Sequence, residues 1–105
     1  MSFHIEWTHG VGRIFDDGLT FENADPFFSV MAIEKIGPDA VYVSADLSQR
    51  PLKKSDIADC YAKLREAGFN LMYCWRKVGR TVPRGAKSGK QLRVVGELAF
   101  WEVEL

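Results

Sequence analysis

The sequence contains few of the residues that bind metal ions or form covalent cross-links. Its 105 residues include only two cysteines and two histidines, and neither cysteine lies in a CxxC or Cys/His pattern. Because a protein metal site usually draws three or four ligands from such patterns, we predict no metal. Isolated cysteines such as Cys60 and Cys74 are more typical of buried free thiols in an intracellular protein than of a disulfide-stabilised secreted one.

Longer sequence signals are also absent. No apolar run approaches the ~18 residues that a membrane span needs, and the first residues do not resemble a signal peptide. The GxSxG and HExxH motifs are missing, and no nucleophile lies beside a base. The run from Gly85 to Gln91 is not a phosphate-binding Walker loop, because three residues instead of four separate its glycines. We therefore predict a cytoplasmic protein with no membrane partner and no identifiable catalytic residue.

Positive charge is concentrated in the second half of the chain. The formal net charge is zero, but residues 1–50 hold eight acidic and three basic side chains, whereas residues 51–105 hold six acidic and eleven basic ones. A flexible basic segment attracts phosphates or acidic protein surfaces, although it can also be a solvated loop that prevents strand edges from aggregating. We predict that the segment binds an anionic partner, such as nucleic acid or an acidic protein, through Arg76, Lys77, Arg80, Arg84, Lys87, Lys90 and Arg93.

The central stretch 40–77 predicts a strand, a helix and a second strand. Ser55 is a suitable N-cap and Gly68 a suitable C-terminal residue for the helix. The flanking strands alternate, with their odd-numbered residues predicted to form the buried face, and the tryptophans are predicted to lie in the core. If the strands are parallel, they form a right-handed βαβ unit. The apolar arc of the helix consists of Ile57, Cys60, Tyr61, Leu64 and Ala67.

The two ends of the chain are predicted to be mainly strands. Alternation indicates strands at 3–8 and 13–15, with turns at 9–10 and 17–18, and allows a return strand at 19–21. An Asp-Pro start and a Gly-Pro stop favour a helix at 26–36, although its Phe, Val and Ile residues are also compatible with a strand. Residues 91–105 read as one long strand, bent at a glycine and antiparallel to 69–78.

Together these elements predict a single α+β domain over residues 1–105, with an α/β-like centre. Its sheet is expected to be mixed and mostly antiparallel, with two helices and a long C-terminal β-hairpin whose tip is the basic segment. The function that we favour is that of a non-enzymatic binding or accessory protein acting through this tip. A structural subunit that forms homo-oligomers through an exposed strand edge is an alternative.

The run from Val41 to Trp75 resembles the centre of the GNAT acyltransferase fold. In that fold a strand leads into a pyrophosphate-binding loop of the form Gln/Arg-x-x-Gly-x-Gly/Ala, and a helix and another strand follow. Gln49 matches the first loop position, whereas Leu52 and Lys54 replace the two glycines that admit phosphates to backbone amides. The resemblance implies a minimal, phage-encoded kind of acyl-CoA-dependent transferase as a second alternative. Its cofactor would then contact Gln49, Arg50, Lys53, Lys54 and Ser55.

Overall fold

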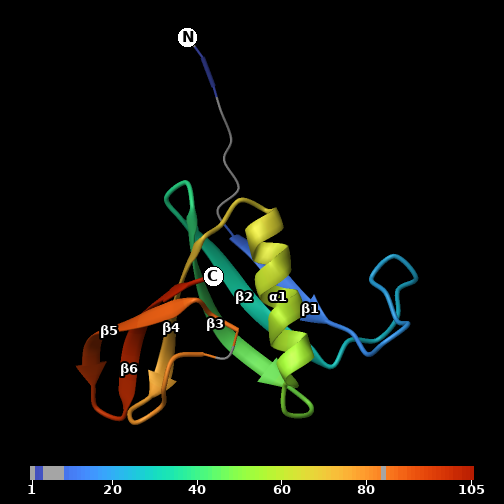
Figure 1. The fold of residues 1–105 in the computed structure, drawn as a ribbon. Coiled ribbons are helices and arrows are strands. Elements are labelled where there is room, and N and C mark those ends of the chain that lie inside the picture. Colours follow the sequence, from blue (N-terminus) through green and yellow to red (C-terminus); the bar gives the residue numbers. More distant parts are fainter. Residues whose placement is uncertain (1, 4–8, 84) are drawn as a thin grey trace.

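The part of the chain that the structure describes is mostly β, with one helix beside a six-stranded sheet. This computed structural model describes residues 2–3, 9–83 and 85–105, and side chains everywhere in these ranges except at positions 45 and 46. The strands have the spatial order β1-β2-β3-β4-β6-β5 (Figure 1). The predicted fold class with two helices is therefore wrong. The elements are β1 (His9–Ile14), β2 (Ser29–Ile36), β3 (Ala40–Ser48), α1 (Lys54–Glu66), β4 (Leu71–Lys77), β5 (Ser88–Val95) and β6 (Leu98–Glu104).

The segment predicted as a helix at 26–36 is instead strand β2. It pairs antiparallel with β1 on one side and with β3 on the other. The presumed N-cap, Asp25, accepts a hydrogen bond from the Thr20 amide at 2.9 Å, so it closes a loop and does not begin a helix. The glycine-proline stop is a turn between β2 and β3, in which Gly37 has a φ of 69°. Pairing on both edges outweighs the local helix signals.

In the first part of the chain, the observed elements do not begin and end where we predicted. The predicted strand at 3–8 lies almost wholly outside the described residues. Strand β1 begins at His9, where we predicted a turn, and contains most of the predicted strand at 13–15. The predicted return strand at 19–21 is part of a turn-rich loop, in which the amide of Leu19 donates to the carbonyl of Asp16 at 3.0 Å.

The predicted long final strand is divided by a turn. Gly96, with a φ of 60°, lies in the turn between β5 and β6, so the bend that we predicted is a reversal of direction. Strand β6 pairs with β4 as expected, but β5 folds back onto the outer edge of β6. Residues 78–87 consequently form a connection from β4 to the edge of the sheet, and not a hairpin tip.

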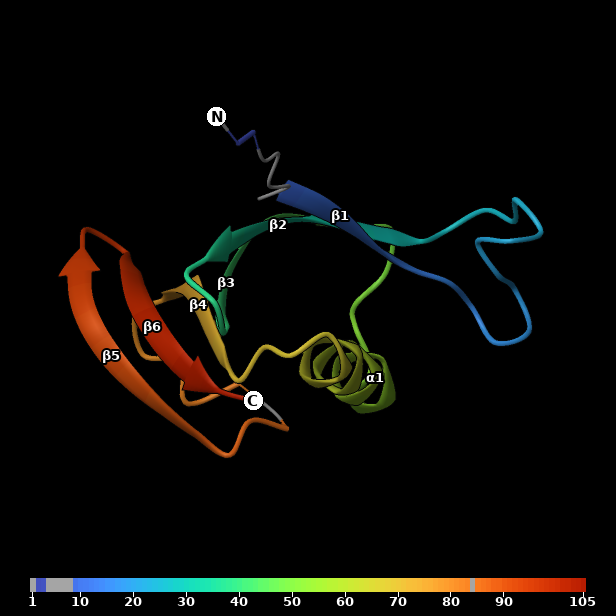
Figure 2. The ribbon, with the colours of Figure 1, turned by 90° about the horizontal axis from the view of Figure 1, so that it is seen from above.

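The central β3-α1-β4 unit forms as predicted, with β3 and β4 parallel. The N-cap is Lys53 rather than Ser55, and its amide donates to the Asp56 carboxylate at 2.8 Å. The helix ends before Gly68, whose φ of 97° is the left-handed conformation expected after a helix. Seen along the sheet, α1 covers only one face (Figure 2).

The hydrophobic core lies between α1 and this covered face. Tyr61 of the helix packs in a cluster with Val41 of β3, Met72 of β4 and Trp101 of β6, all buried. Ile57, Cys60 and Leu64 pack against the same cluster, which confirms most of the predicted helical arc. Ala67, at the end of that arc, is exposed.

Strand β4 presents the opposite face to the one we predicted. Its even-numbered residues Met72 and Cys74 contact the core, so its odd-numbered residues Tyr73 and Trp75 point away from the helix. Trp75 is 39% exposed, whereas Trp101 is 8% exposed. The prediction that all three tryptophans belong to the core is thus correct for Trp101 and wrong for Trp75, and Trp7 lies outside the described residues.

Candidate functional site

Four aromatic side chains gather on the sheet face opposite α1. In the parallel pair, Tyr42 of β3 lies beside Tyr73 of β4, and in the antiparallel pair Trp75 of β4 lies opposite Phe100 of β6. Cross-strand neighbours share a face of the sheet, so all four rings lie on the side without the helix. We call Tyr42, Tyr73, Trp75 and Phe100 the aromatic face.

Phe100 is the centre of the aromatic face. Its ring centroid lies 5.8 Å from that of Tyr73 in a stacked geometry, 4.9 Å from that of Trp75 and 6.2 Å from that of Tyr42. The Tyr73 hydroxyl donates to Glu102 at 2.9 Å. This hydrogen bond, with a further contribution from burial, raises the pKa of Tyr73. The contacts fix the rings in place while leaving Trp75 substantially accessible.

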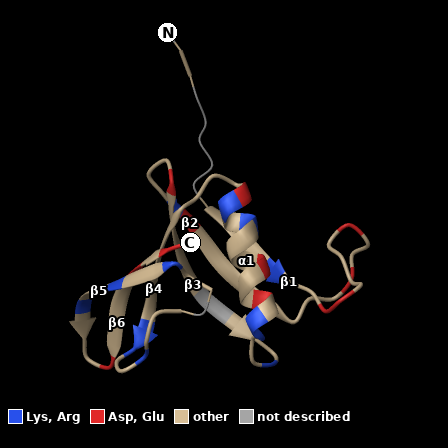
Figure 3. Ribbon diagram, viewed as in Figure 1, with Lys and Arg blue, Asp and Glu red and all other residues tan. Residues whose placement is uncertain are grey.

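Three of the seven predicted basic residues flank the aromatic face. Lys77 lies opposite Leu98, Lys90 opposite Glu102, and Arg93 opposite Phe100, so they share the open face. All three are exposed. Figure 3 shows the lysine and arginine positions along β4 and β5. This arrangement places positive charge beside the rings, at the end of β4 and along β5.

Of the other four predicted basic residues, the three that the structure describes do not join this surface. Arg76 lies opposite Ala99 and therefore points to the covered face. Arg80 and Lys87 belong to the connection 78–87, part of which packs on the covered face, where Ala86 contacts the core. Arg84 lies outside the described residues. The predicted basic site is thus divided between the two faces of the sheet.

A cleft opens beside the aromatic face where β3 and β4 separate. Their parallel pairing covers only residues 40–42 and 71–73, and the strands then diverge (Figure 1). The cleft has a volume of about 560 Å³, and Tyr42, Trp75, Cys74 and Arg76 contribute to its lining. Burial raises the pKa of the Cys74 thiol, and the nearby Arg76 charge opposes this effect. Within the described ranges, the buried Nε of Arg76 has no hydrogen-bond partner.

The predicted cofactor loop before α1 is engaged in contacts within the protein. Arg50 bonds to Asp16 at 3.0 Å and to Asp56 at 3.2 Å, and its guanidinium lies 3.6 Å from the centroid of the Phe28 ring. The Gln49 amide donates to the carbonyl of Phe28 at 2.9 Å. A carboxylate, Asp56, thus already occupies the helix N-terminus that a phosphate would approach.

The Asp56 carboxyl links this loop to the helix. Its pKa lies below the ordinary value, first because it accepts the hydrogen bond of the Lys53 amide and then because Arg50 donates to it, although partial burial opposes the shift. Lys53, Lys54 and Ser55 are exposed beside it. The five predicted cofactor residues are thus neighbours in the sequence, but the contacts of this loop cap the helix and do not leave its N-terminus open to a phosphate.

Two other kinds of feature are absent from the described residues. They contain no group of three or more His, Cys, Asp or Glu side chains placed to hold a metal ion. None of their helices is long and apolar enough to cross a membrane.

The sequence suggested Tyr73 and Trp75 as stacking partners beside the basic segment, but it did not place them with Tyr42 and Phe100 on one open face. Alternation in 71–76 separates Tyr73 and Trp75 from Met72 and Cys74, but it does not say which set faces the core. Larger apolar side chains favoured the odd set, and the structure buries the even set. No protein-family model, curated protein or solved structure matches this chain significantly, so the candidate site is described by its own geometry.

Proposed function

We propose that this protein binds single-stranded nucleic acid on the aromatic face. The observation that carries the proposal is the position of Trp75 and Phe100, paired across β4 and β6 and flanked by Lys77 and Arg93. Base rings stack on aromatic side chains, and lysine and arginine neutralise the phosphates of the same strand. An open sheet face that carries both groups is suited to a flexible chain of bases and phosphates.

The charges and rings of this face favour single strands over duplexes. In a duplex the bases are stacked on one another, so their faces are not available to Trp75 or Phe100. The acidic Glu102 on the same face is engaged by the Tyr73 hydroxyl and lies opposite Lys90, which reduces its repulsion of phosphates. We therefore expect binding that depends on salt, tolerates different sequences and prefers unpaired bases.

The test is a titration of the purified protein against mixed-sequence single- and double-stranded oligonucleotides at low and moderate salt. Fluorescence anisotropy of a labelled oligonucleotide reports the affinity. The Trp75→Ala variant should lose about 1–3 kcal/mol of binding free energy, roughly 5- to 150-fold in Kd, because one stacking partner is removed. Trp75→Phe should retain most of the affinity.

A charge reversal gives a second arm with a matched control. Lys77→Glu should weaken binding and reduce its salt dependence, since one phosphate contact is lost. Lys63→Glu introduces the same charge change on the solvent side of α1, where the Lys63 side chain is 83% exposed, and should have a much smaller effect. Absence of binding to single strands even at low salt would refute the proposal.

A second candidate function is binding of acyl-CoA, and the cleft between β3 and β4 favours it. The unpaired strand edges there offer backbone groups to an extended ligand with amides, and the parallel β3-α1-β4 unit has the arrangement that the GNAT resemblance implies. The engaged helix N-terminus at Asp56 disfavours it, because phosphates would meet a carboxylate. A thermal-shift assay with acetyl-CoA decides the question: ligand at 100 times its Kd adds about 2.7 kcal/mol, and no shift at millimolar cofactor removes this candidate.

A further inference from the structure

The loop between β1 and β2, residues 15–28, projects from the sheet (Figure 1) and is held together by its own hydrogen bonds. Its ends are joined because the Phe28 amide donates to the carbonyl of Ile14 at 3.0 Å. Inside it, the Asp25 carboxylate accepts from the Thr20 amide at 2.9 Å, and the Thr20 hydroxyl oxygen accepts from the Asn23 amide at 3.2 Å. A compact loop with close ends and internal hydrogen bonds presents its outer side chains in a defined position.

This projecting loop exposes apolar groups that an isolated protein would be expected to bury. Phe21 is 64% exposed, Phe27 41% and Leu19 37%. The Arg13 guanidinium lies 5.5 Å from the centroid of the Phe21 ring and 5.3 Å from that of Phe27, so it supports both rings from one side. An exposed apolar group held on an ordered loop is typical of a contact surface.

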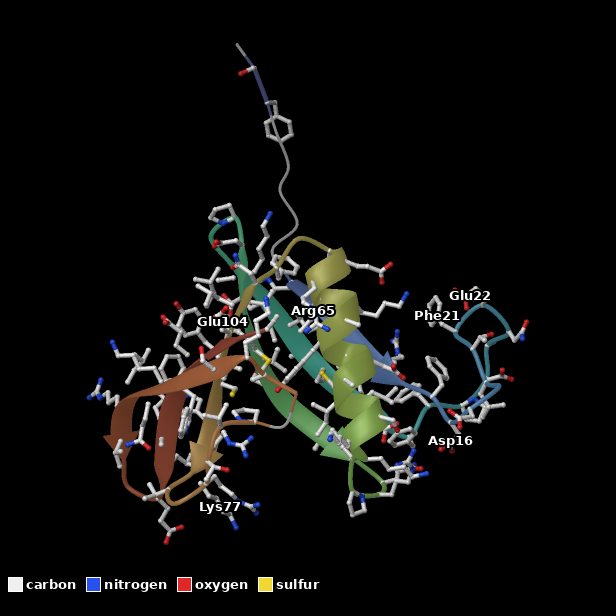
Figure 4. All side chains as sticks on the ribbon, viewed as in Figure 1. Asp16, Phe21, Glu22, Arg65, Lys77 and Glu104 are labelled. Carbon is white, nitrogen blue, oxygen red and sulfur yellow. The ribbon has the colours of Figure 1, made fainter. Side chains whose placement is uncertain are left out.

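The same loop carries only negative charge. Residues 14–28 contain four acidic residues and no lysine or arginine. Two of the acids have internal roles, since Asp16 pairs with Arg50 and Asp25 closes the loop. Asp17 and Glu22 are exposed and remain available to a cationic partner. Figure 3 shows the acidic positions along this loop, and Figure 4 places Phe21 and Glu22 on its far part.

The opposite end of the sheet has the complementary character. Four aliphatic residues are exposed around the β5–β6 turn, namely Val78, Val94, Val95 and Leu98. The Val78 amide donates to the carbonyl of Glu97 at 2.9 Å, so the residue after β4 lies against this turn. From residue 76 to residue 96 the sequence contains seven basic residues and no acidic one. We define the turn patch by its apolar residues Val78, Val95 and Leu98 and its basic residues Lys77, Arg80 and Arg93, whereas Val94 lies opposite Ala99 and therefore points to the covered face.

The two surfaces cannot meet within one molecule. The loop and the β5–β6 turn lie at opposite ends in both ribbon views (Figures 1 and 2), and Lys77 is far from Phe21 in Figure 4. Two copies can meet, because the formal net charge is zero and the molecules do not repel one another as whole bodies. We propose that the projecting loop of one copy docks on the turn patch of a second copy. This docking goes beyond the proposed function, although the turn patch and the proposed nucleic-acid surface share Lys77 and Arg93.

Two variants, each removing one side of the contact, test this proposal. The loop variant combines Phe21→Ser with Glu22→Lys, and the turn variant combines Val78→Glu with Val95→Glu. All four positions are exposed, so both variants should fold, which circular dichroism and thermal melting check. Sedimentation velocity without nucleic acid should show concentration-dependent association of the natural protein that weakens with salt, and a monomer for each variant alone.

Mixing the variants provides the sharpest result. The turn variant retains an intact loop and the loop variant an intact turn patch, so an equimolar mixture should form a 1:1 heterodimer and nothing larger. The matched control, Val11→Ser with Glu66→Lys, changes an exposed apolar residue and an exposed acid outside both surfaces and should associate like the natural protein.

Three outcomes would overturn the proposal: a natural protein that is monomeric at all concentrations in low salt, variants that associate as well as the natural protein, or a mixture that stays monomeric. The loop variant retains Trp75, Lys77, Lys90 and Arg93, so its oligonucleotide affinity should equal that of the natural protein at concentrations where the natural protein is monomeric. That measurement distinguishes a failure of docking from a failure of the proposed function.

Discussion

Both faces of the sheet carry large apolar side chains, but the protein uses the two faces differently. On the covered face, Met72, Trp101 and Val103 are buried under α1. On the open face, Tyr73, Trp75 and Phe100 contact one another and remain partly accessible. Strands β4 and β6 are thus apolar on both sides, and position relative to the helix separates core from surface. An accessible aromatic group with cations beside it is more useful for recognition than for stability.

The largest expected effect compares two tryptophans on these opposite faces. Trp101→Ala should reduce the free energy of unfolding by about 3–5 kcal/mol, because a buried ring leaves a cavity. Trp75→Ala should cost less than half as much, since its ring is 39% exposed and loses mainly the contact with Phe100. Urea denaturation measures both variants. Equal losses would show that the open face is a second core.

A tyrosine on the covered face gives the next largest effect. Burial raises the pKa of Tyr61 to about 12, against about 10 in an unfolded chain. Because the folded pKa is the higher one, the neutral phenol contributes stability below about pH 10 and loses it as pH rises towards 12, by about 3 kcal/mol in all. Denaturation experiments across this pH range should show the loss of stability. The Tyr61→Phe variant should lack the part of the loss that comes from ionisation of Tyr61.

The capping contact at the start of α1 gives a smaller effect. Asp56→Asn should destabilise the protein by about 1 kcal/mol at neutral pH, because the charged acceptor at the helix start is lost. The folded pKa of Asp56 is lowered, so its contribution is present above the unfolded value of about 3.9 and disappears as pH falls through the folded pKa. The variant and the natural protein should therefore converge in acid. Asp59→Asn, an exposed change on the same helix, is the control.

The smallest effect concerns the tyrosine on the open face. Glu102→Gln should lower the pKa of Tyr73 towards its ordinary value, because its hydrogen bond to a carboxylate is the main cause of the shift. The pKa of Tyr61 should not change, since burial is its first cause. NMR titration of the tyrosine ring signals measures both groups. A parallel shift of Tyr61 would mean that the two faces are electrostatically coupled.

The parts of the fold that were predicted correctly depend on local signals. The α1 helix has an apolar arc and Gly68 after its end, and the flanking strands alternate regularly. The error at β2 arose because Asp25 and Pro26 resemble a helix start, whereas the Asp25 side chain bonds to Thr20 in a loop. Such a contact depends on how a loop folds, and the residues at 25–36 do not reveal it.

The candidate site was predicted only in part for a similar reason. The charge of the basic segment is visible in the sequence, but its six described residues are distributed over both faces and the connection, with Lys77, Lys90 and Arg93 on the open face. The aromatic face combines side chains from three strands that are up to 58 positions apart, Tyr42 and Phe100 being the extremes. Only the order of strands brings them together.

The sequence by itself determined the central helix, most of the strands and the separation of negative from positive charge along the chain. The tertiary structure decided that β6 lies between β4 and β5 and that Met72, rather than Tyr73, faces the helix. The physical reason is that alternation along a strand defines two faces without distinguishing them. That distinction arises only when α1 packs against one face and leaves the other open.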